Sequence, residues 1–228
     1  MATPHPYGTP DAPHLTVRGV AHLEAAPDLA HITVTLTARG RDRRATLDDL
    51  TRRNTTALDL IKSCGDAVEQ LETGALTLVP ELTAHGRGER VRAHHGTVRL
   101  TAGLSDFTAL GELTARLADL DLTRVDGPWW SLRPDSPAHR RARREAVDDA
   151  VRRAREYAGA LGTTLAALVE LTDTGTGHPE PLTRMRATAF AGPPEDGTPP
   201  PLDLEPQRQH LHAEVDARFT LVPPRLQD

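Results

Sequence analysis

The chain has 228 residues, a formal net charge of −5 and hydrophobic residues at 38% of its positions. This composition predicts a globular protein of one large domain or two smaller lobes, and the negative charge argues against a general nucleic-acid-binding protein. Because Cys64 is the only cysteine, the chain cannot form an internal disulfide.

The N-terminal sequence and the hydropathy pattern contain no export or membrane signal. Residues 1–13 hold four prolines and no apolar run of the kind a signal peptide needs, which predicts a disordered lead. A stretch of about 18 apolar residues, the length of a membrane span, is also missing. We therefore expect a cytoplasmic protein that has no membrane partner.

Two alternating segments open the ordered part of the chain. Apolar residues recur at every second position over 15–23 and 32–36, which is the period of half-buried strands. Pro27 and Asp28 lie between the two segments, so the pattern predicts a β-hairpin. The apolar residues of 47–61 then follow the spacing of an amphipathic helix.

The middle of the chain repeats this order of strands and helix. Residues 75–82 and 90–104 predict a second pair of strands. Leucine spacing over 110–120 predicts a helix, with Asp106 as its N-cap. A strand over 123–132 returns the chain.

The longest predicted helix runs from Ser136 to Leu161. Ser136 is a candidate N-cap, and Pro137 suits the first helical position. Alanine recurs every four residues from Ala138 to Ala158, so one side of this helix is nearly smooth. Another backbone can pack closely against that side.

The C-terminal part combines two strands with a long irregular segment. Residues 165–171 predict a strand, residues 173–207 are rich in Pro and Gly and predict a loop, and residues 223–228 form a tail. Strict alternation over 210–221 predicts a last strand that returns to the sheet, because its apolar face has to be buried. The whole pattern predicts an α+β fold, with mainly antiparallel sheet packed against three helices.

Three strings and the C-terminal strand occur in a defined order along the chain. The strings are Ala26-Pro27-Asp28-Leu29-Ala30, Val125-Asp126-Gly127 and the alanine series from Ala142 to Ala158. In this order they resemble the SIMPL-domain family, a set of mostly bacterial proteins of unknown function that includes periplasmic immunogenic proteins. The resemblance covers residues 14–222 as one domain.

The resemblance carries its own implications for fold and function. It implies an α+β fold with a tendency to form homo-oligomers, in some relatives large ring-like assemblies. It implies no enzymatic activity, no cofactor and no catalytic residue, and the family analogy alone suggests a stress-linked role. The sequence departs from the family at two points: residues 1–13 lack the signal peptide of many relatives, and Pro128 replaces a β-branched residue, which predicts an edge strand or a local distortion.

Trp129 and Trp130 are the residues we expect to provide an interface or ligand contact. Aromatic residues make up only 3% of the chain, and neighbours on a strand face opposite sides, so one tryptophan can lie in the core while the other is exposed. Core packing combined with an oligomer interface is favoured over a small-molecule pocket.

Other residues with reactive side chains fit structural roles. His210 and His212 would share one face of a strand, but the sequence has no zinc-binding spacing, so we expect no metal ligands. Arginines of the long predicted helix stand four residues from acidic residues, which predicts a self-neutralised surface. Cys64 lies near a helix C-terminus, where the helix dipole disfavours a thiolate.

The sequence contains no recognisable catalytic constellation. It therefore predicts a non-enzymatic, homo-oligomeric binding or scaffold protein with an unidentified protein or small-molecule partner, and with no nucleic-acid partner, cofactor or metal. The alternative is a small-molecule-binding protein or enzyme with a pocket near Trp129 and Trp130.

Overall fold

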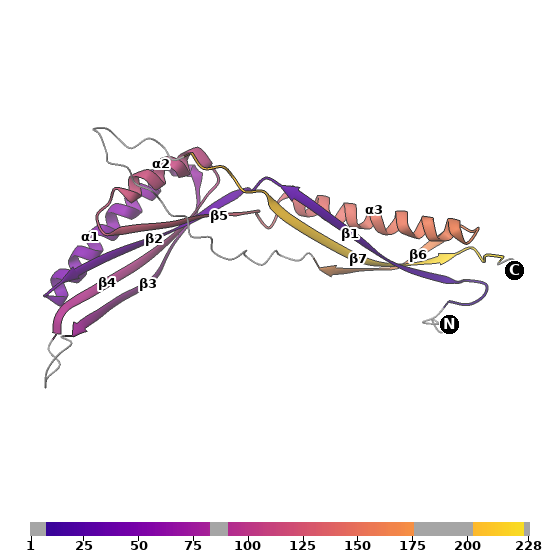
Figure 1. The fold of residues 1–228 in the computed structure, drawn as a ribbon, viewed down its shortest axis with the longest axis horizontal. Helices are drawn as coiled ribbons and strands as arrows, with labels where there is room; N and C mark the ends of the chain where they lie inside the picture. The colour runs from indigo at the N-terminus through magenta and orange to yellow at the C-terminus, as the bar shows by residue number, and fades with distance from the viewer. Residues whose placement is uncertain (1–7, 83–90, 176–202, 226–228) are drawn as a thin grey trace. The chain divides into compact units, whose positions relative to one another are not determined.

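A computed structural model describes residues 8–82, 91–175 and 203–225. The chain divides into two compact units, each with its own antiparallel sheet (Figure 1). The four-stranded unit is built on Pro27–Arg133 with Ala187–Gln207, and the three-stranded unit on Met1–Ala26, Pro134–Arg186 and Arg208–Asp228, as far as these are described. The predicted α+β class is confirmed, with three α-helices in the described part of the chain.

The four-stranded unit places two helices on one face of its sheet (Figure 1). Its strands are β2 (Leu29–Gly40), β3 (Val68–Leu82), β4 (Val91–Leu104) and β5 (Thr123–Ser131), in the order β3-β4-β2-β5. The helices are α1 (Arg43–Lys62) and α2 (Phe107–Ala118). Alternation puts Ile32, Val34 and Leu36 of β2 beneath them, fully buried, which explains the period-2 pattern of the sequence.

Both helices of this unit begin at an aspartate. The Asp42 carboxylate accepts a 2.7 Å hydrogen bond from the amide of Ala45 at the start of α1. Asp106, the predicted cap, accepts hydrogen bonds from the amides of Thr108 (2.9 Å) and Ala109 (3.1 Å). These bonds satisfy amide groups that a helix start otherwise leaves without a partner.

Hydrogen bonds also hold together the two ends of this unit's chain. The amide of Asp28 donates to the Ser131 carbonyl at 2.9 Å, and the amide of Arg133 donates to the Asp28 carboxylate at 3.1 Å. The segment therefore begins and ends at the same place on its own sheet.

The three-stranded unit packs one long helix on its sheet. Its strands are β1 (His14–Ala25), β6 (Leu165–Gly175) and β7 (Gln209–Leu221), in the order β1-β7-β6, and its helix is α3 (Pro137–Ala160). β7 returns to the sheet as predicted and pairs antiparallel with both neighbours. Helix α3 lies over β1 and β7 and touches β6 little.

The predicted hairpin of the first two strands is wrong. β1 pairs with β7 in the three-stranded sheet, whereas β2 pairs with β4 and β5 in the other sheet. Alternation identifies a strand and its buried face but not its partner, so the short Pro27-Asp28 link resembles a turn while it joins two different units.

Alanines bring α3 close to β1. Every fourth residue from Ala142 to Ala158 is buried, as the sequence predicts. A Cβ atom at Gly19 of β1 would lie 2.0 Å from the Ala146 carbonyl oxygen and 2.6 Å from the Ala150 amide nitrogen. Only glycine permits this approach of strand and helix.

Two further sequence predictions concern the C-terminal loop and membrane-spanning helices. The predicted loop over 173–207 lies largely outside the described residues, although β6 extends through its first residues to Gly175. Among the described helices, none combines the length and apolarity needed to cross a membrane.

Candidate functional site

The two neighbouring tryptophans of β5 lie on opposite sides of the four-stranded sheet. Trp130 packs edge-on against Phe107 of α2, with ring centroids 4.7 Å apart, and joins the core beneath the helices. Trp129 lies on the face that α1 and α2 do not cover, and 44% of its surface is exposed. The alternation of a strand thus divides the pair as expected.

An extra residue in β5 sets what surrounds Trp129. Asp126 is opposite Thr33 of β2 and Trp129 is opposite His31, so β5 contains one residue more than β2 over this stretch. This bulge puts Asp126 and Trp129 on the same open face. Pro128 lies within it, on the edge strand that its proline predicted.

Hydrogen bonds already engage the polar groups nearest Trp129. His31 Nε2 lies 2.9 Å from Ser131 Oγ, and burial of the imidazole lowers the pKa of His31. Arg124 Nε donates to Asp126 at 2.9 Å. Because these groups pair with one another, this face offers no free acid, base or nucleophile among them.

A second ion pair lies near the end of β5. Arg133 Nε donates to Glu69 Oε2 at 3.0 Å, and this hydrogen bond lowers the pKa of the Glu69 carboxyl group. The pair is net neutral, like that of Arg124 and Asp126.

The three-stranded unit offers a different surface, the edge strand β6. Leu168, Val169 and Leu171 are 55%, 50% and 47% exposed. Leu168 and Leu171 are opposite Phe219 and Ala217 of β7, which are buried on the α3 side. One helix is too narrow to cover three strands, so the apolar side chains of β6 stay exposed.

Sequence reasoning missed this surface, although residues 165–171 were predicted as a strand. An apolar run with one charged residue, Glu170, normally indicates a strand that is buried on both faces. The available signal was the lack of proline and lysine, the residues that commonly protect an exposed edge.

The histidines of β7 pair with acidic residues. His210 Nδ1 lies 3.6 Å from Glu24, His212 Nε2 lies 3.5 Å from Glu214, and the rings of His22 and His212 are 4.7 Å apart. Within the residues that the structure describes, no three His, Cys, Asp or Glu side chains converge as metal ligands would.

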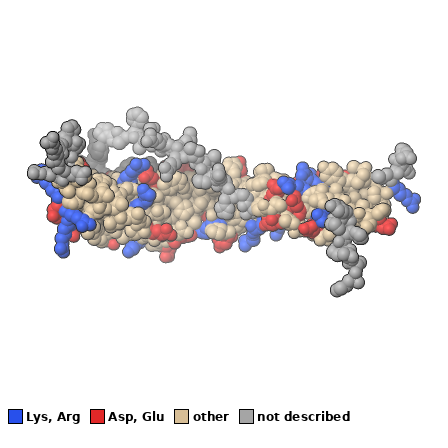
Figure 2. Space-filling view, turned by 90° about the horizontal axis from the view of Figure 1, so that it is seen from below, with Lys and Arg blue, Asp and Glu red and all other residues tan. Residues whose placement is uncertain are grey.

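The arginines of α3 are partly neutralised along the helix. Arg141 binds Glu145 at 2.8 Å, Arg152 binds Glu156 at 3.1 Å, and Arg153 lies 3.8 Å from Asp149. Figure 2 shows basic and acidic side chains interspersed on the face it displays. This arrangement fits a solvated surface better than a polyanion-binding patch.

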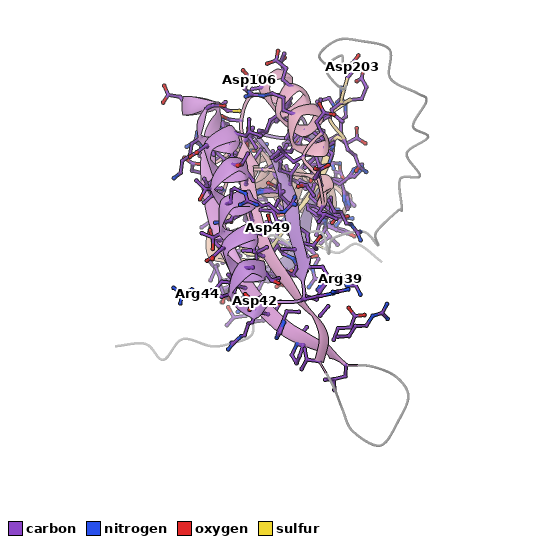
Figure 3. The ribbon with its side chains drawn as sticks, turned by 90° about the vertical axis from the view of Figure 1, so that its left-hand side faces the viewer. Arg39, Asp42, Arg44, Asp49, Asp106 and Asp203 are labelled. Carbon is purple, nitrogen blue, oxygen red and sulfur yellow. The ribbon has the colours of Figure 1, made fainter. Side chains whose placement is uncertain are left out.

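Two cavities lie apart from the tryptophans of β5. One, of about 250 Å³, lies beside Asp49 of α1 (Figure 3), where Arg53 donates to both the Asp49 carboxylate (3.0 Å) and the Asp121 carbonyl (2.7 Å). The other, of about 360 Å³, is lined by His22, Asp148 and other residues of the three-stranded unit. Neither includes Trp129 or Trp130. Burial raises the pKa of the Cys64 thiol, which disfavours a reactive thiolate there.

The family model for SIMPL, described as "Protein of unknown function (DUF541)", matches residues 15–219. The chain belongs to the SIMPL family. The match spans both units, so the two sheets together form the SIMPL region of the sequence.

Relatives of this SIMPL protein include proteins with little functional description. It is 23% identical to the uncharacterized protein YggE of Edwardsiella ictaluri (strain 93-146), over 93% of this chain and 88% of that protein. It is 22% identical to the 26 kDa periplasmic immunogenic protein of Brucella melitensis biotype 1, over 81% of this chain and 77% of that protein. The protein of the same name from Brucella abortus (strain S19) matches with the same identity and coverage.

The names of the Brucella relatives overturn the prediction of a cytoplasmic location, which is wrong. That prediction used cysteine content and hydropathy. A core of Leu, Ile, Val and Ala needs no disulfide, so such a domain folds in an oxidising or a reducing compartment and its composition does not distinguish them.

Proposed function

We infer that this SIMPL protein is a non-enzymatic binding or scaffold protein that works as a homo-oligomer. The observation that carries the proposal is the uncovered apolar surface of β6, formed by Leu168, Val169 and Leu171. Exposed apolar surface costs about 25 cal/mol per Å², so a contiguous strip of this kind favours a partner surface that removes it from water.

The surroundings of Trp129 support a binding role over catalysis. Arg124 pairs with Asp126 on the same open face as Trp129, Arg133 pairs with Glu69, and burial favours neutral His31. Paired groups position a surface but do not transfer protons efficiently. The periplasmic relatives support a working place in the periplasm.

The test is the solution mass of the full-length chain. Light scattering coupled to size exclusion, from nanomolar to high micromolar concentration, is expected to give a mass of two or more chains of 24.7 kDa. A mass of one chain at every concentration would refute self-association.

A second candidate function rests on Trp129 itself. Its exposed indole, next to the hydrogen-bonded pair of His31 and Ser131, suits an uncharged ligand that stacks on the ring. A thermal-shift screen of neutral metabolites is expected to identify a stabilising compound, and Trp129→Ala is expected to abolish that stabilisation. A compound that stabilises the wild type and Trp129→Ala equally would contradict binding at this site.

A further inference from the structure

His22 of β1 and His212 of β7 form a cross-strand pair on one face of the three-stranded sheet. They are directly opposite each other in the antiparallel register, and their ring centroids are 4.7 Å apart with a tilt of 34° between the rings. The neighbouring residues Ala21 and Ala213 are buried on the α3 side. Because side chains alternate along a strand, both imidazoles lie on the face that α3 does not cover.

The surroundings of His212 leave one of its ring nitrogens available to an ion. Nε2 lies 3.5 Å from the Glu214 carboxylate, which Arg18 binds in turn at 2.7 Å. A carboxylate beside one ring nitrogen favours the proton on that nitrogen and leaves a lone pair on the other. That other atom, Nδ1, is buried and has no hydrogen-bond partner within the described residues. Histidines that bind metal ions commonly have such a carboxylate beside the nitrogen that does not bind.

His22 provides a second ring nitrogen. In the part of the chain that the structure describes, its imidazole contacts His212 but makes no hydrogen bond or ion pair, and its side chain is exposed. His22 also borders the cavity of about 360 Å³ that acidic residues of α3, Asp148 and Asp149 among them, help to line. A cation can therefore reach His22 from solvent past carboxylate groups.

The separation of the two rings fits a shared ion. Two imidazoles that bind one ion at about 2.0–2.1 Å, at right angles or in a tetrahedral arrangement, have ring centres roughly 4.5–5.2 Å apart. The 4.7 Å between His22 and His212 lies within this interval. The pairing of β1 with β7 thus already sets the spacing that a chelate of two histidines needs.

We propose that His22 and His212 bind one divalent transition-metal ion between β1 and β7, with water completing its coordination. Imidazole suits Cu²⁺, Ni²⁺ and Zn²⁺, whereas Mg²⁺ and Ca²⁺ prefer oxygen ligands. No third protein ligand converges on the pair among the described residues, so the site is open and selects little by geometry. Its affinity follows the general order for nitrogen ligands, in which Cu²⁺ binds more tightly than Zn²⁺.

The spacing of histidines in the sequence could not indicate this site. The candidates that it offered, His210 and His212, belong to one strand, and His210 Nδ1 lies 3.6 Å from Glu24 instead. His22 meets His212 only because the first strand of the chain pairs with the last. The proposal goes beyond the binding or scaffold role inferred above and does not depend on self-association.

Metal titration of single variants tests the pair. Calorimetry of the full-length chain with Cu²⁺, Zn²⁺ and, as a negative control, Mg²⁺ compares the wild type with His22→Gln and His212→Gln. Each substitution is expected to weaken the tightest Zn²⁺ and Cu²⁺ site at least about tenfold, because loss of one ligand abolishes the chelate. The matched control is His95→Gln, which replaces an exposed strand histidine of β4 and is expected to leave binding unchanged.

Spectra of the wild type locate the ion without any substitution. In ¹H–¹⁵N spectra of the histidine rings, Zn²⁺ is expected to shift Nδ1 of His212 and one ring nitrogen of His22, while Nε2 of His212 keeps its proton. Far-ultraviolet circular dichroism shows whether each variant is folded. If a variant does not fold, these spectra of the wild type decide the question.

Three results would overturn the site. They are a wild type that binds neither Cu²⁺ nor Zn²⁺, equal binding by the wild type and both histidine variants, and Zn²⁺-induced shifts confined to other histidines. Each of them leaves the proposed homo-oligomer standing, because light scattering measures self-association separately.

Discussion

At the scale of single residues, Gly19 sets how closely β1 and α3 approach. Its missing side chain leaves room for the backbone of Ala146 and Ala150, so the helix rests on the strand with almost no side-chain layer between. The same helix has a glycine, Gly159, at which an added Cβ would meet no atom within 4 Å. Substitutions at Gly19 and Gly159 together therefore distinguish a steric clash from the general effect of replacing glycine.

Gly19→Ala is expected to lower the free energy of unfolding by about 3 kcal/mol, because the added methyl group forces β1 away from α3. Gly159→Ala, in the last turn of α3, is expected to raise it by up to about 1 kcal/mol through helix propensity. Urea denaturation followed by circular dichroism measures both. Equal effects of the two variants would show that β1 and α3 are not tightly packed.

His31 makes the stability of the four-stranded unit depend on pH. Burial lowers the pKa of His31 in the folded state, whereas in the unfolded chain it titrates near its ordinary value of about 6.5. The unfolded state therefore binds the proton first, so stability falls as the pH drops below about 6.5 and levels off below the folded-state pKa.

The measurement is the urea midpoint at neutral pH and at pH of about 5, for the wild type and for His31→Gln. The amide can still bond Ser131, and the variant is expected to lose less stability on acidification. The pKa of Glu69 is also lowered, so its contribution to stability is lost only in more acidic solution, as the pH falls through the ordinary pKa of a glutamate towards its folded-state pKa. If the wild type and His31→Gln showed the same pH dependence of stability, His31 would not be its source.

At the scale of elements, the helices differ in whether a side chain caps the free amide groups of their first turn. Asp106 accepts two backbone hydrogen bonds at the start of α2, whereas the side chain of Ser136 makes no capping hydrogen bond at the start of α3. Both residues match the capping pattern of the sequence, so the pattern predicts the position of a cap but not whether its side chain bonds.

Asp106→Ala is expected to cost about 1 kcal/mol of stability through loss of these bonds. Ser136→Ala is expected to cost less than about 0.5 kcal/mol, since no capping bond is lost. Thermal unfolding of the two variants gives the comparison. A larger loss for Ser136→Ala would indicate a bond at α3 that forms in solution.

Sequence patterns predicted most elements because burial in them is periodic. Alternation located β7, and the four-residue alanine repeat located the buried side of α3. Which strands pair was harder to predict, since β1 and β2 are adjacent in sequence yet lie in different sheets. The β6 surface was missed because Leu168 and Leu171 have the composition of a core strand, and their exposure depends on the width of a single helix.

At the scale of the whole molecule, the two units have cores of different composition. Leucine, isoleucine and valine dominate beneath α1 and α2, whereas alanines form the helix side of the other core. Alanine buries little surface, so the three-stranded unit gains less hydrophobic stabilisation for each residue ordered.

Separate cores predict separate opening. Leu100→Ala removes a fully buried side chain of β4 and is expected to cost about 3 kcal/mol. Native-state hydrogen exchange is expected to show lower protection in β2 and β4 while α3 and β7 keep theirs. An equal drop across all these elements would mean that the two units unfold as one.

The hydrogen bonds of Asp28 with Ser131 and Arg133 have a consequence for how such chains diversify. They join the entry and exit of residues 27–133, so this segment closes on itself at its base, although its unit also takes in residues 187–207. The rest of the fold tolerates changes of length within residues 27–133, because the hydrogen bonds at the base keep the two ends of this segment the same distance apart. An alignment of SIMPL relatives is therefore expected to show length differences within residues 27–133 and few at Asp28, Ser131 and Arg133 themselves.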